Sequence, residues 1–239
     1  MTSTNIQDLV EPWTIGAITA QEAIQGNVFR LMCEGGEQYV LKNIGERTAE
    51  KISRLEFERD VLSHVEAQGL PVAVPLLARD GLPHSLVSGE IYRLSRWLPN
   101  TPAEPRTPAE KDHLYRSYGR AIARFHDALA SYTDEVMLRR TWTTTLHKRV
   151  FVEAVPSIQK NTAPEQLPAF AQLLGEVEAD MRTAFTDLPL QPIIWDCHGG
   201  NIAVDGLDVT GFVDCDLIAV APKVMDLGDF LVHLIKWDI

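Results

Sequence analysis

The feature that most constrains the fold is a proline-rich stretch near the middle of the chain. Within residues 99–108 there are four prolines: Pro99, Pro102, Pro105 and Pro108. Proline lacks a backbone N–H and fixes φ, so neither a helix nor a central strand can run through this segment. We therefore expect it to begin a second part of the molecule, with an N-terminal lobe at 1–98 and a C-terminal lobe at 99–239.

The N-terminal lobe reads as strands with one helix. Residues 27–33 and 38–44 are rich in β-forming side chains, and the turn signal Gly35-Gly36 separates them, which predicts a hairpin. Residues 48–68 carry an apolar stripe at helical spacing and stop before Gly69, which predicts a helix.

The C-terminal lobe has a different character. Helical patterns cover residues 109–132, 164–185 and 224–237, and short apolar strands are expected at 192–195 and 209–213. A strand-rich part with one helix, followed by a helix-rich part, predicts an α+β fold with two lobes: an N-terminal antiparallel sheet with one helix, and a mainly helical C-terminal lobe.

Charge and hydropathy limit the partners of the chain. It has 33 Asp and Glu against 22 Lys and Arg, a net charge of −11. So acidic a protein lacks the basic face that nucleic-acid binding requires, so we expect no nucleic-acid partner. The start of the sequence has no signal-peptide pattern, and no apolar run reaches the roughly 18 residues of a membrane span. We expect a cytoplasmic protein without a membrane partner.

Three polar residues follow or open short apolar strands. Asp196 ends one strand, Asn201 opens the next, and Asp214 follows a third. Phosphoryl transfer needs a group that accepts a hydroxyl proton and oxygen ligands for magnesium. Asp196 is our candidate base, and Asn201 and Asp214 are candidate metal ligands, because a kinase base precedes a metal-binding Asn by five positions.

Two plainer interpretations stand beside this one. Asp, Asn and Gly are common in loops at strand ends, whatever their chemistry. Soft ligands also gather here, at Cys197, His198 and Cys215, but they lack paired-cysteine spacing, so we do not predict a zinc site.

Lys42 and Glu58 form a second signal. Strand alternation puts Lys42 on a face with Val40 and Ile44, and Glu58 lies inside the apolar stripe of the helix 48–68. A charge on an apolar face requires a partner of opposite sign. We expect these two residues to pair, although each could instead lie at the edge of its element and reach solvent.

Several segments in this order resemble a known family. They are Tyr39-Val40-Leu41-Lys42, Glu56-Phe57-Glu58-Arg59-Asp60-Val61-Leu62, Gly69-Leu70-Pro71-Val72, Gly119-Arg120-Ala121-Ile122-Ala123-Arg124-Phe125-His126, the run from Asp196 to Asn201, and Gly211-Phe212-Val213-Asp214 through Met225-Asp226-Leu227. The chain resembles the superfamily of aminoglycoside phosphotransferases and choline kinases, which includes homoserine-kinase-like and hydroxylysine-kinase-like members.

The resemblance implies a protein-kinase-like fold that binds ATP and Mg²⁺. Lys42 would contact the α- and β-phosphates with Glu58 as its partner. Asp196 would be the base, and Asn201 and Asp214 the metal ligands. The acceptor would be a hydroxyl group of a small molecule: an amino alcohol, amino acid or amino sugar. Its identity and the oligomeric state carry no readable signal.

Further roles follow from the same resemblance. Arg96-Trp97-Leu98 would be the hinge that meets adenine, and Gln25-Gly26-Asn27 would lie in the phosphate-covering loop. Asp226 would brace the catalytic loop from the following helix.

The sequence departs from the family at the catalytic loop. Ile194 stands where a bracing histidine is usual, and Trp195 follows it. Family members also continue through more helices after the position of Ile239, so a short member, a truncated chain or a covering partner is expected. These departures keep open a catalytically weak or inactive, pseudokinase-like nucleotide-binding module. A protein kinase is disfavoured, because a multi-glycine loop and an Ala-Pro-Glu segment are missing.

Overall fold

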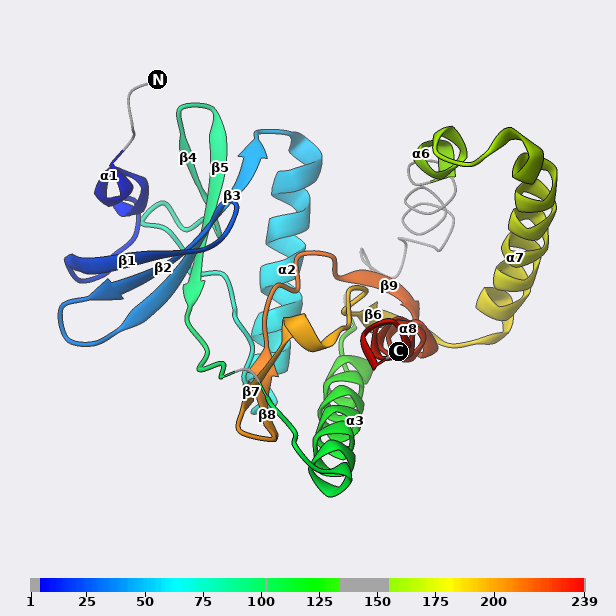
Figure 1. Cartoon of the computed structure of the whole chain (residues 1–239). Helices are drawn as coiled ribbons and strands as arrows, with labels where there is room; N and C mark the ends of the chain where they lie inside the picture. The colour runs from blue at the N-terminus through cyan, green and yellow to red at the C-terminus, as the bar shows by residue number, and fades with distance from the viewer. Residues whose placement is uncertain (1–4, 102, 134–154, 239) are drawn as a thin grey trace. The chain divides into compact units, whose positions relative to one another are not determined.

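The computed structural model describes residues 5–101, 103–133 and 155–238. Its contacts divide the chain into two compact units. The sheet unit comprises Met1–Phe125 and Gly199–Asp216, and the helical unit comprises His126–His198 and Leu217–Ile239. An antiparallel sheet with helices in one unit and mainly helices in the other confirm the predicted α+β class (Figure 1).

The units do not divide the chain at residue 98. Gly199–Asp216 belongs with the N-terminal residues, because strand residue Phe212 bridges to Val72. The lobes at 1–98 and 99–239 stay a prediction.

The sheet unit is built on five strands in the order β1-β2-β3-β5-β4, with every neighbouring pair antiparallel. The strands are β1 (Ile18–Gln25), β2 (Val28–Cys33), β3 (Gln38–Glu46), β4 (Ser85–Val87) and β5 (Glu90–Arg96). The predicted hairpin is confirmed as β2 and β3. β1 was not predicted, because almost all of its side chains are exposed and its sequence has no apolar alternation.

The two faces of the sheet have different roles. Leu41 of β3 lies opposite Leu94 of β5, and both are fully buried in a core with α1 (Ile6–Val10). Lys42 lies opposite Arg93, one position later in β3 and one position earlier in β5. Because side chains alternate between faces, Lys42 and Arg93 point away from that core.

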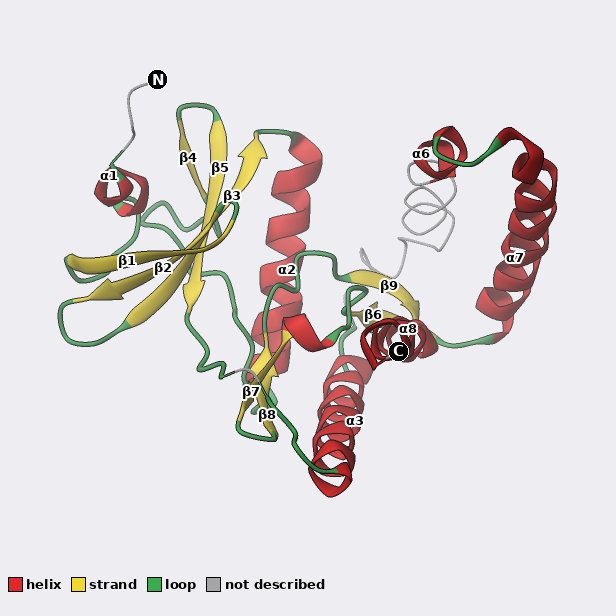
Figure 2. Cartoon of the chain, viewed as in Figure 1, coloured by secondary structure: helices red, strands yellow, loops and turns green. Residues whose placement is uncertain are grey.

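Helix α2 (Ala49–Ala67) lies against the face that carries Arg93, and confirms the helix predicted at 48–68 (Figure 2). Thr48 caps its start, since the Thr48 hydroxyl accepts a hydrogen bond of 3.2 Å from the Lys51 N–H. Gly69 follows its end with φ of +81°, a conformation that glycine adopts without strain. The buried face of α2 holds Leu55, Val61 and Leu62, and also Glu58.

A hairpin from late in the sequence completes the sheet unit. It consists of β7 (Ile202–Asp205) and β8 (Asp208–Phe212), and follows the short 3-10 helix η3 (Gly199–Asn201). Helix α3 (Pro108–Ala130) packs against this hairpin, with the Phe125 and Phe212 rings 4.7 Å apart. α3 confirms the helix predicted at 109–132.

Gly211 lets the hairpin approach the segment after α2 closely. The Phe212 N–H donates to the Pro71 carbonyl at 3.1 Å, and the Ala73 N–H donates to the Phe212 carbonyl at 3.0 Å. A Cβ at Gly211 would lie 2.6 Å from the Pro71 oxygen and 2.9 Å from Leu98 Cδ1. Only glycine fits there without displacing backbone.

The helical unit contains a two-stranded sheet and several helices. Strands β6 (Leu190–Ile193) and β9 (Ala219–Pro222) pair antiparallel. The helices are α6 (Val155–Lys160), η2 (Pro164–Gln166), α7 (Leu167–Asp187) and α8 (Val224–Asp238). Predicted helices 164–185 and 224–237 are confirmed as η2 with α7, and as α8. Among the described residues, no helix has the length and apolar character needed to cross a membrane.

Candidate active site

A cavity of about 200 Å³ lies in the sheet unit, and it gathers residues that are far apart in the sequence. β1, the start of β2, β3 and β5 form one part of its wall, and the segment around Asn201 and Asp214 forms another. Six of the eight predicted site residues line it: Lys42, Arg96, Trp97, Leu98, Asn201 and Asp214. Gln25 also lines it, from the predicted phosphate-covering loop.

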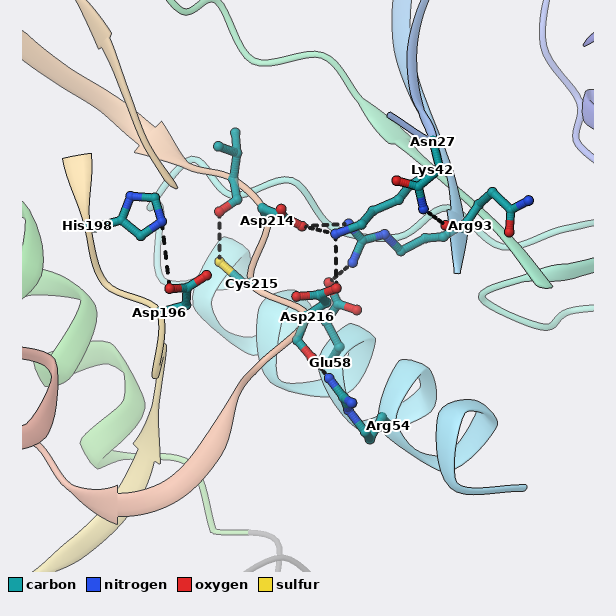
Figure 3. Close-up of polar contacts among 12 residues, drawn as sticks. Asn27, Lys42, Arg54, Glu58, Arg93, Asp196, His198, Asp214, Cys215 and Asp216 are labelled. Atoms are coloured by element: carbon teal, nitrogen blue, oxygen red, sulfur yellow. Dashed lines mark hydrogen bonds and ion pairs between the residues drawn. The ribbon is translucent and has the colours of Figure 1, made fainter. Parts of the chain in front are cut away.

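Lys42 connects the sheet to the segment that carries Asp214. Its Nζ lies 2.5 Å from Asp214 Oδ1 and 3.0 Å from Asp216 Oδ2 (Figure 3). Asp216 is itself held by Arg54, whose guanidinium donates to the Asp216 carbonyl at 2.6 Å. Although burial opposes it, the charges of Lys42 and Arg93 lower the pKa of the Asp216 carboxyl. An ammonium at the predicted phosphate position therefore has two carboxylate partners.

The predicted pair between Lys42 and Glu58 is wrong for this structure, because Glu58 contacts Arg93 instead. Arg93 NH1 donates to Glu58 Oε1, and the two side chains are only 6% and 3% exposed. Burial raises the pKa of Glu58, and the Arg93 charge opposes this rise only in part. Glu58 is buried as expected, but its partner comes from β5 and not from β3.

Asn201 and Asp214 are held near one another by the backbone. The Val213 N–H donates to the Asn201 carbonyl at 2.9 Å, immediately before Asp214. Asp214 has φ of +53°, an unusual conformation for a residue with a side chain, and such strain is concentrated at functional sites. The Asp214 side chain is 44% exposed, so its carboxylate can be reached from solvent.

The predicted hinge has a fixed tryptophan at its centre. The Trp97 N–H donates to the Gln38 carbonyl at 2.9 Å, and the Arg30 guanidinium lies 4.3 Å from the centre of the indole ring. Because β3 engages the Trp97 N–H, a purine at this hinge would use backbone groups of neighbouring residues.

Asp196 belongs to the helical unit and lies in the loop just after β6, which ends at Ile193. His198 Nε2 lies 3.6 Å from Asp196 Oδ1, and the His198 ring stacks on His233 with 4.8 Å between ring centres. Trp195 has φ of +68°, so the backbone turns sharply just before the predicted base. Burial, and then the charges of nearby aspartates, raise the pKa of Cys197 far above its usual range.

Asp226 at the start of α8 holds the backbone before Asp196. Its carboxylate accepts hydrogen bonds from the N–H groups of Ile194 at 3.0 Å and Trp195 at 2.8 Å. His126 Nε2 lies 2.8 Å from Asp226 Oδ2, and the Asp226 side chain is fully buried. An ionised carboxylate only accepts hydrogen bonds, so a hydrogen bond to ionised Asp226 would require the His126 tautomer with a proton on Nε2. The contacts of Asp226 are those expected of a brace for this loop.

The two predicted metal ligands offer oxygen atoms of different kinds. Asn201 provides an amide and Asp214 a carboxylate, an oxygen set of the kind that Mg²⁺ prefers when substrate phosphates complete its coordination. The described part of the chain holds no group of three or more His, Cys, Asp or Glu side chains placed to bind a metal ion. A metal ion held by Asn201 and Asp214 would therefore depend on further ligands such as phosphate oxygens.

The family model that matches the sequence is that of the phosphotransferase enzyme family, over residues 20–238. The chain belongs to this phosphotransferase family. No curated protein matches the sequence.

Solved structures show that this phosphotransferase has the protein-kinase-like fold. It is similar to an amicoumacin kinase, hAmiN, in complex with AMP-PNP, Ca²⁺ and Ami, at 16% identity, covering 97% of this chain and 69% of that one with a TM-score of 0.69. The aminoglycoside phosphotransferase APH(3'')-Id from Streptomyces rimosus, in complex with ADP and streptomycin, is 19% identical. The match covers 97% of this chain and 82% of that one, with a TM-score of 0.64. A GDP complex of aminoglycoside 2'-phosphotransferase-IIIa is 13% identical. The match covers 96% of this chain and 77% of that one, with a TM-score of 0.63.

Sequence reasoning missed two residues of this phosphotransferase. Arg93 lines the cavity and binds Glu58, yet it sits in a strand whose register depends on the whole sheet. His126 carries no motif of its own, although it is the last residue of a segment that supports the family resemblance. The role of a buried histidine in a helix becomes recognisable only when its partner, here Asp226, is known from the structure.

Proposed function

We propose that this phosphotransferase transfers the γ-phosphoryl group of ATP, with Mg²⁺, to a hydroxyl group of a small molecule. The acceptor class we favour is an amino alcohol, amino acid or amino sugar. The observation that carries this proposal is the shared cavity in which Lys42, Asn201, Asp214 and the hinge Arg96-Trp97-Leu98 meet. Structures of similar fold contain ADP, AMP-PNP or GDP, which supports a nucleotide as the ligand of this cavity.

In this proposal Lys42 binds the α- and β-phosphates. An ammonium is a compact cation that suits phosphate oxygens, and charge-assisted hydrogen bonds are the strongest that proteins form. Asp216 keeps Lys42 oriented, since its Oδ2 lies 3.0 Å from Nζ. Asn201 and Asp214 would hold Mg²⁺, which neutralises charge on the transferring phosphates.

Asp196 would accept the proton of the acceptor hydroxyl. The acceptor oxygen forms a bond to the γ-phosphorus, the bond from that phosphorus to the bridging oxygen breaks, and ADP leaves with the electron pair. Asp226 and His126 would keep the loop before Asp196 in place, because Asp226 binds the backbone at Ile194 and Trp195 and His126 holds Asp226.

A screen for acceptor-dependent ADP release tests the proposal. The panel should contain hydroxylated amines, amino acids and aminoglycosides, with GTP run beside ATP because three of the similar structures are GDP complexes. With a true acceptor, Asp196→Asn should lower kcat by roughly 100- to 10,000-fold, the usual contribution of a general base. Unchanged turnover in this variant would show that Asp196 is not the base.

The second candidate is a nucleotide-binding module without transfer activity. Two observations favour it: Ile194 stands where the family usually has histidine, and Trp195 occupies the position directly before the predicted base. ATP binding without ADP release for any member of the panel would support this candidate over the first.

A further inference from the structure

Besides the hinge residue Arg96, the sheet places Lys42 and Arg93 at the candidate nucleotide cavity. Lys42 on β3 and Arg93 on β5 are direct partners in the register of these strands, so their side chains lie beside one another on the same face. Both line the cavity. Figure 3 shows their side chains reaching toward the same group of carboxylates.

Arg93 is held in place by a residue that does not line the cavity. Glu58 binds the NH1 group of Arg93, and Glu58 Oε2 has no hydrogen-bond partner within the described part of the chain. The other amino group, NH2, lies 3.6 Å from Asp214 Oδ1, beyond hydrogen-bonding distance. One end of the guanidinium is therefore fixed, and the other faces the predicted metal ligand.

The guanidinium stays charged in this surrounding. Arginine keeps its proton in proteins, and the carboxylate of Glu58 contacts the buried guanidinium of Arg93. A buried guanidinium costs free energy unless its donors are used, and its planar shape matches phosphate oxygens. Asp214 is the carboxylate that Lys42 and Arg93 share.

We propose that Arg93 is a second phosphate-binding residue of the nucleotide site, and that Glu58 is a positioning residue that acts through Arg93. The inference rests on the proposed function of the cavity. When Asp214 is engaged by a divalent cation, Lys42 Nζ and Arg93 NH2 each have a donor for a phosphate oxygen. Glu58 then fulfils the role of the family's glutamate, but for the arginine and not for the lysine.

A double variant, Glu58→Gln with Arg93→Gln, separates phosphate binding from structural support. It removes both charges together, so no buried charge is left unpaired, and the amides can still hydrogen-bond to one another. The matched control is Glu11→Gln with Arg79→Gln, which removes an exposed ion pair of the same unit. Circular dichroism first establishes that each variant is folded.

Isothermal titration with ATP and Mg²⁺, and with adenosine alone, gives the readout. We expect the Glu58→Gln, Arg93→Gln protein to bind ATP about tenfold or more weakly than the wild type, with adenosine affinity unchanged. The control should match the wild type for both ligands. A third variant, Arg93→Lys with Glu58 retained, should bind ATP more tightly than the double variant but more weakly than the wild type. Lysine keeps the positive charge but lacks the planar fork of arginine.

Three results would count against the inference, and each has a different meaning. If the double variant bound ATP as tightly as the wild type, the Glu58–Arg93 pair would be structural. That result would overturn the phosphate-binding role of Arg93 but not the proposed function of the cavity. A wild-type protein that binds neither ATP nor GTP would overturn the proposed function, and the inference with it. An equal loss of adenosine and ATP affinity would show that Arg93 shapes the cavity and does not bind phosphate.

Discussion

Lys42 Nζ lies 2.5 Å from Asp214 Oδ1, so the residue proposed for phosphate binding and the residue proposed for metal binding are in direct contact. Their positions in the sequence differ by 172 residues, and the fold alone brings them together. In this arrangement Asp214 neutralises Lys42, while the carboxylate is still 44% exposed. Under the proposed roles, this contact would couple nucleotide binding to metal binding.

We predict that Asp214→Asn removes most of the magnesium dependence of ATP binding. The wild type should bind ATP more tightly with Mg²⁺ than with EDTA, and the variant should lose about tenfold or more of that gain, since a charged ligand is replaced by a neutral one. Titration calorimetry in both buffers measures the difference. The control is Asp205→Asn, at the exposed end of β7. A variant with the magnesium dependence of the wild type would exclude Asp214 as a ligand.

Two histidines of α3 provide a matched test of the loop brace. His126 and its partner Asp226 have side chains that are 5% and 0% exposed, whereas His113 and Asp208 are 50% and 71% exposed. We expect His126→Ala to lower the free energy of unfolding by about 1–3 kcal/mol, because a buried carboxylate loses a donor. His113→Ala should cost less than about 1 kcal/mol. Urea unfolding, monitored by circular dichroism, measures both free energies. Equal losses of stability in the two variants would contradict the role of His126 in bracing the loop.

Two glycines should respond to alanine in opposite directions. Gly211→Ala puts a Cβ 2.6 Å from the Pro71 oxygen, so we predict a loss of about 1–3 kcal/mol in stability. Gly119 lies in α3, and a Cβ added there would meet no atom within 4 Å, so Gly119→Ala should stabilise by about 0.5–1 kcal/mol. Thermal unfolding measures both. If Gly211→Ala left the melting temperature unchanged, the close approach of β8 to Pro71 would be incorrect.

Asp229 is expected to give a stability effect that depends on pH. Burial raises the pKa of its carboxyl, His233 opposes this, and Asp196 adds to it. A carboxyl with a raised folded pKa favours the folded state below its unfolded pKa, and that contribution is lost as pH rises through the folded value. Asp229→Asn should therefore stabilise the protein slightly at pH 8, by less than about 1 kcal/mol because the site is partly exposed, and the gain should shrink toward pH 4.

Urea unfolding of wild type and Asp229→Asn at a series of pH values measures this effect. The control is Asp127→Asn, which makes the same substitution at an exposed position of α3. A gain that grows as pH falls would have the wrong sign for a raised pKa.

Much of the fold was readable because its signals are local. The helix at 48–68 was predicted from an apolar stripe that stops before Gly69, and α2 occupies Ala49–Ala67. Strand alternation alone put Lys42 on the face opposite to Leu41. β1 escaped prediction because Ile18–Gln25 is largely polar and exposed, and is defined by its pairing with β2.

The site residues were partly readable for the same reason. Asp214 and Asn201 follow or begin apolar strands, which is a local pattern, and both line the cavity. The partner of Glu58 was not readable, since it depends on the pairing of β5 with β3, two strands that α2 separates in the sequence. The roles assigned to Asp196, Asn201 and Asp214 remain predictions.

The most direct test of the account is the affinity of Lys42→Met for ATP in the presence of Mg²⁺. Lys42 lines the cavity and contacts Asp214 and Asp216, while its methionine replacement keeps most of the side-chain volume without the charge. We predict that the wild type binds one ATP per chain, and that Lys42→Met binds it about 10- to 100-fold more weakly, the loss expected for a charge-assisted hydrogen bond. Equal affinity in the two proteins would contradict the assignment of this cavity as a nucleotide site.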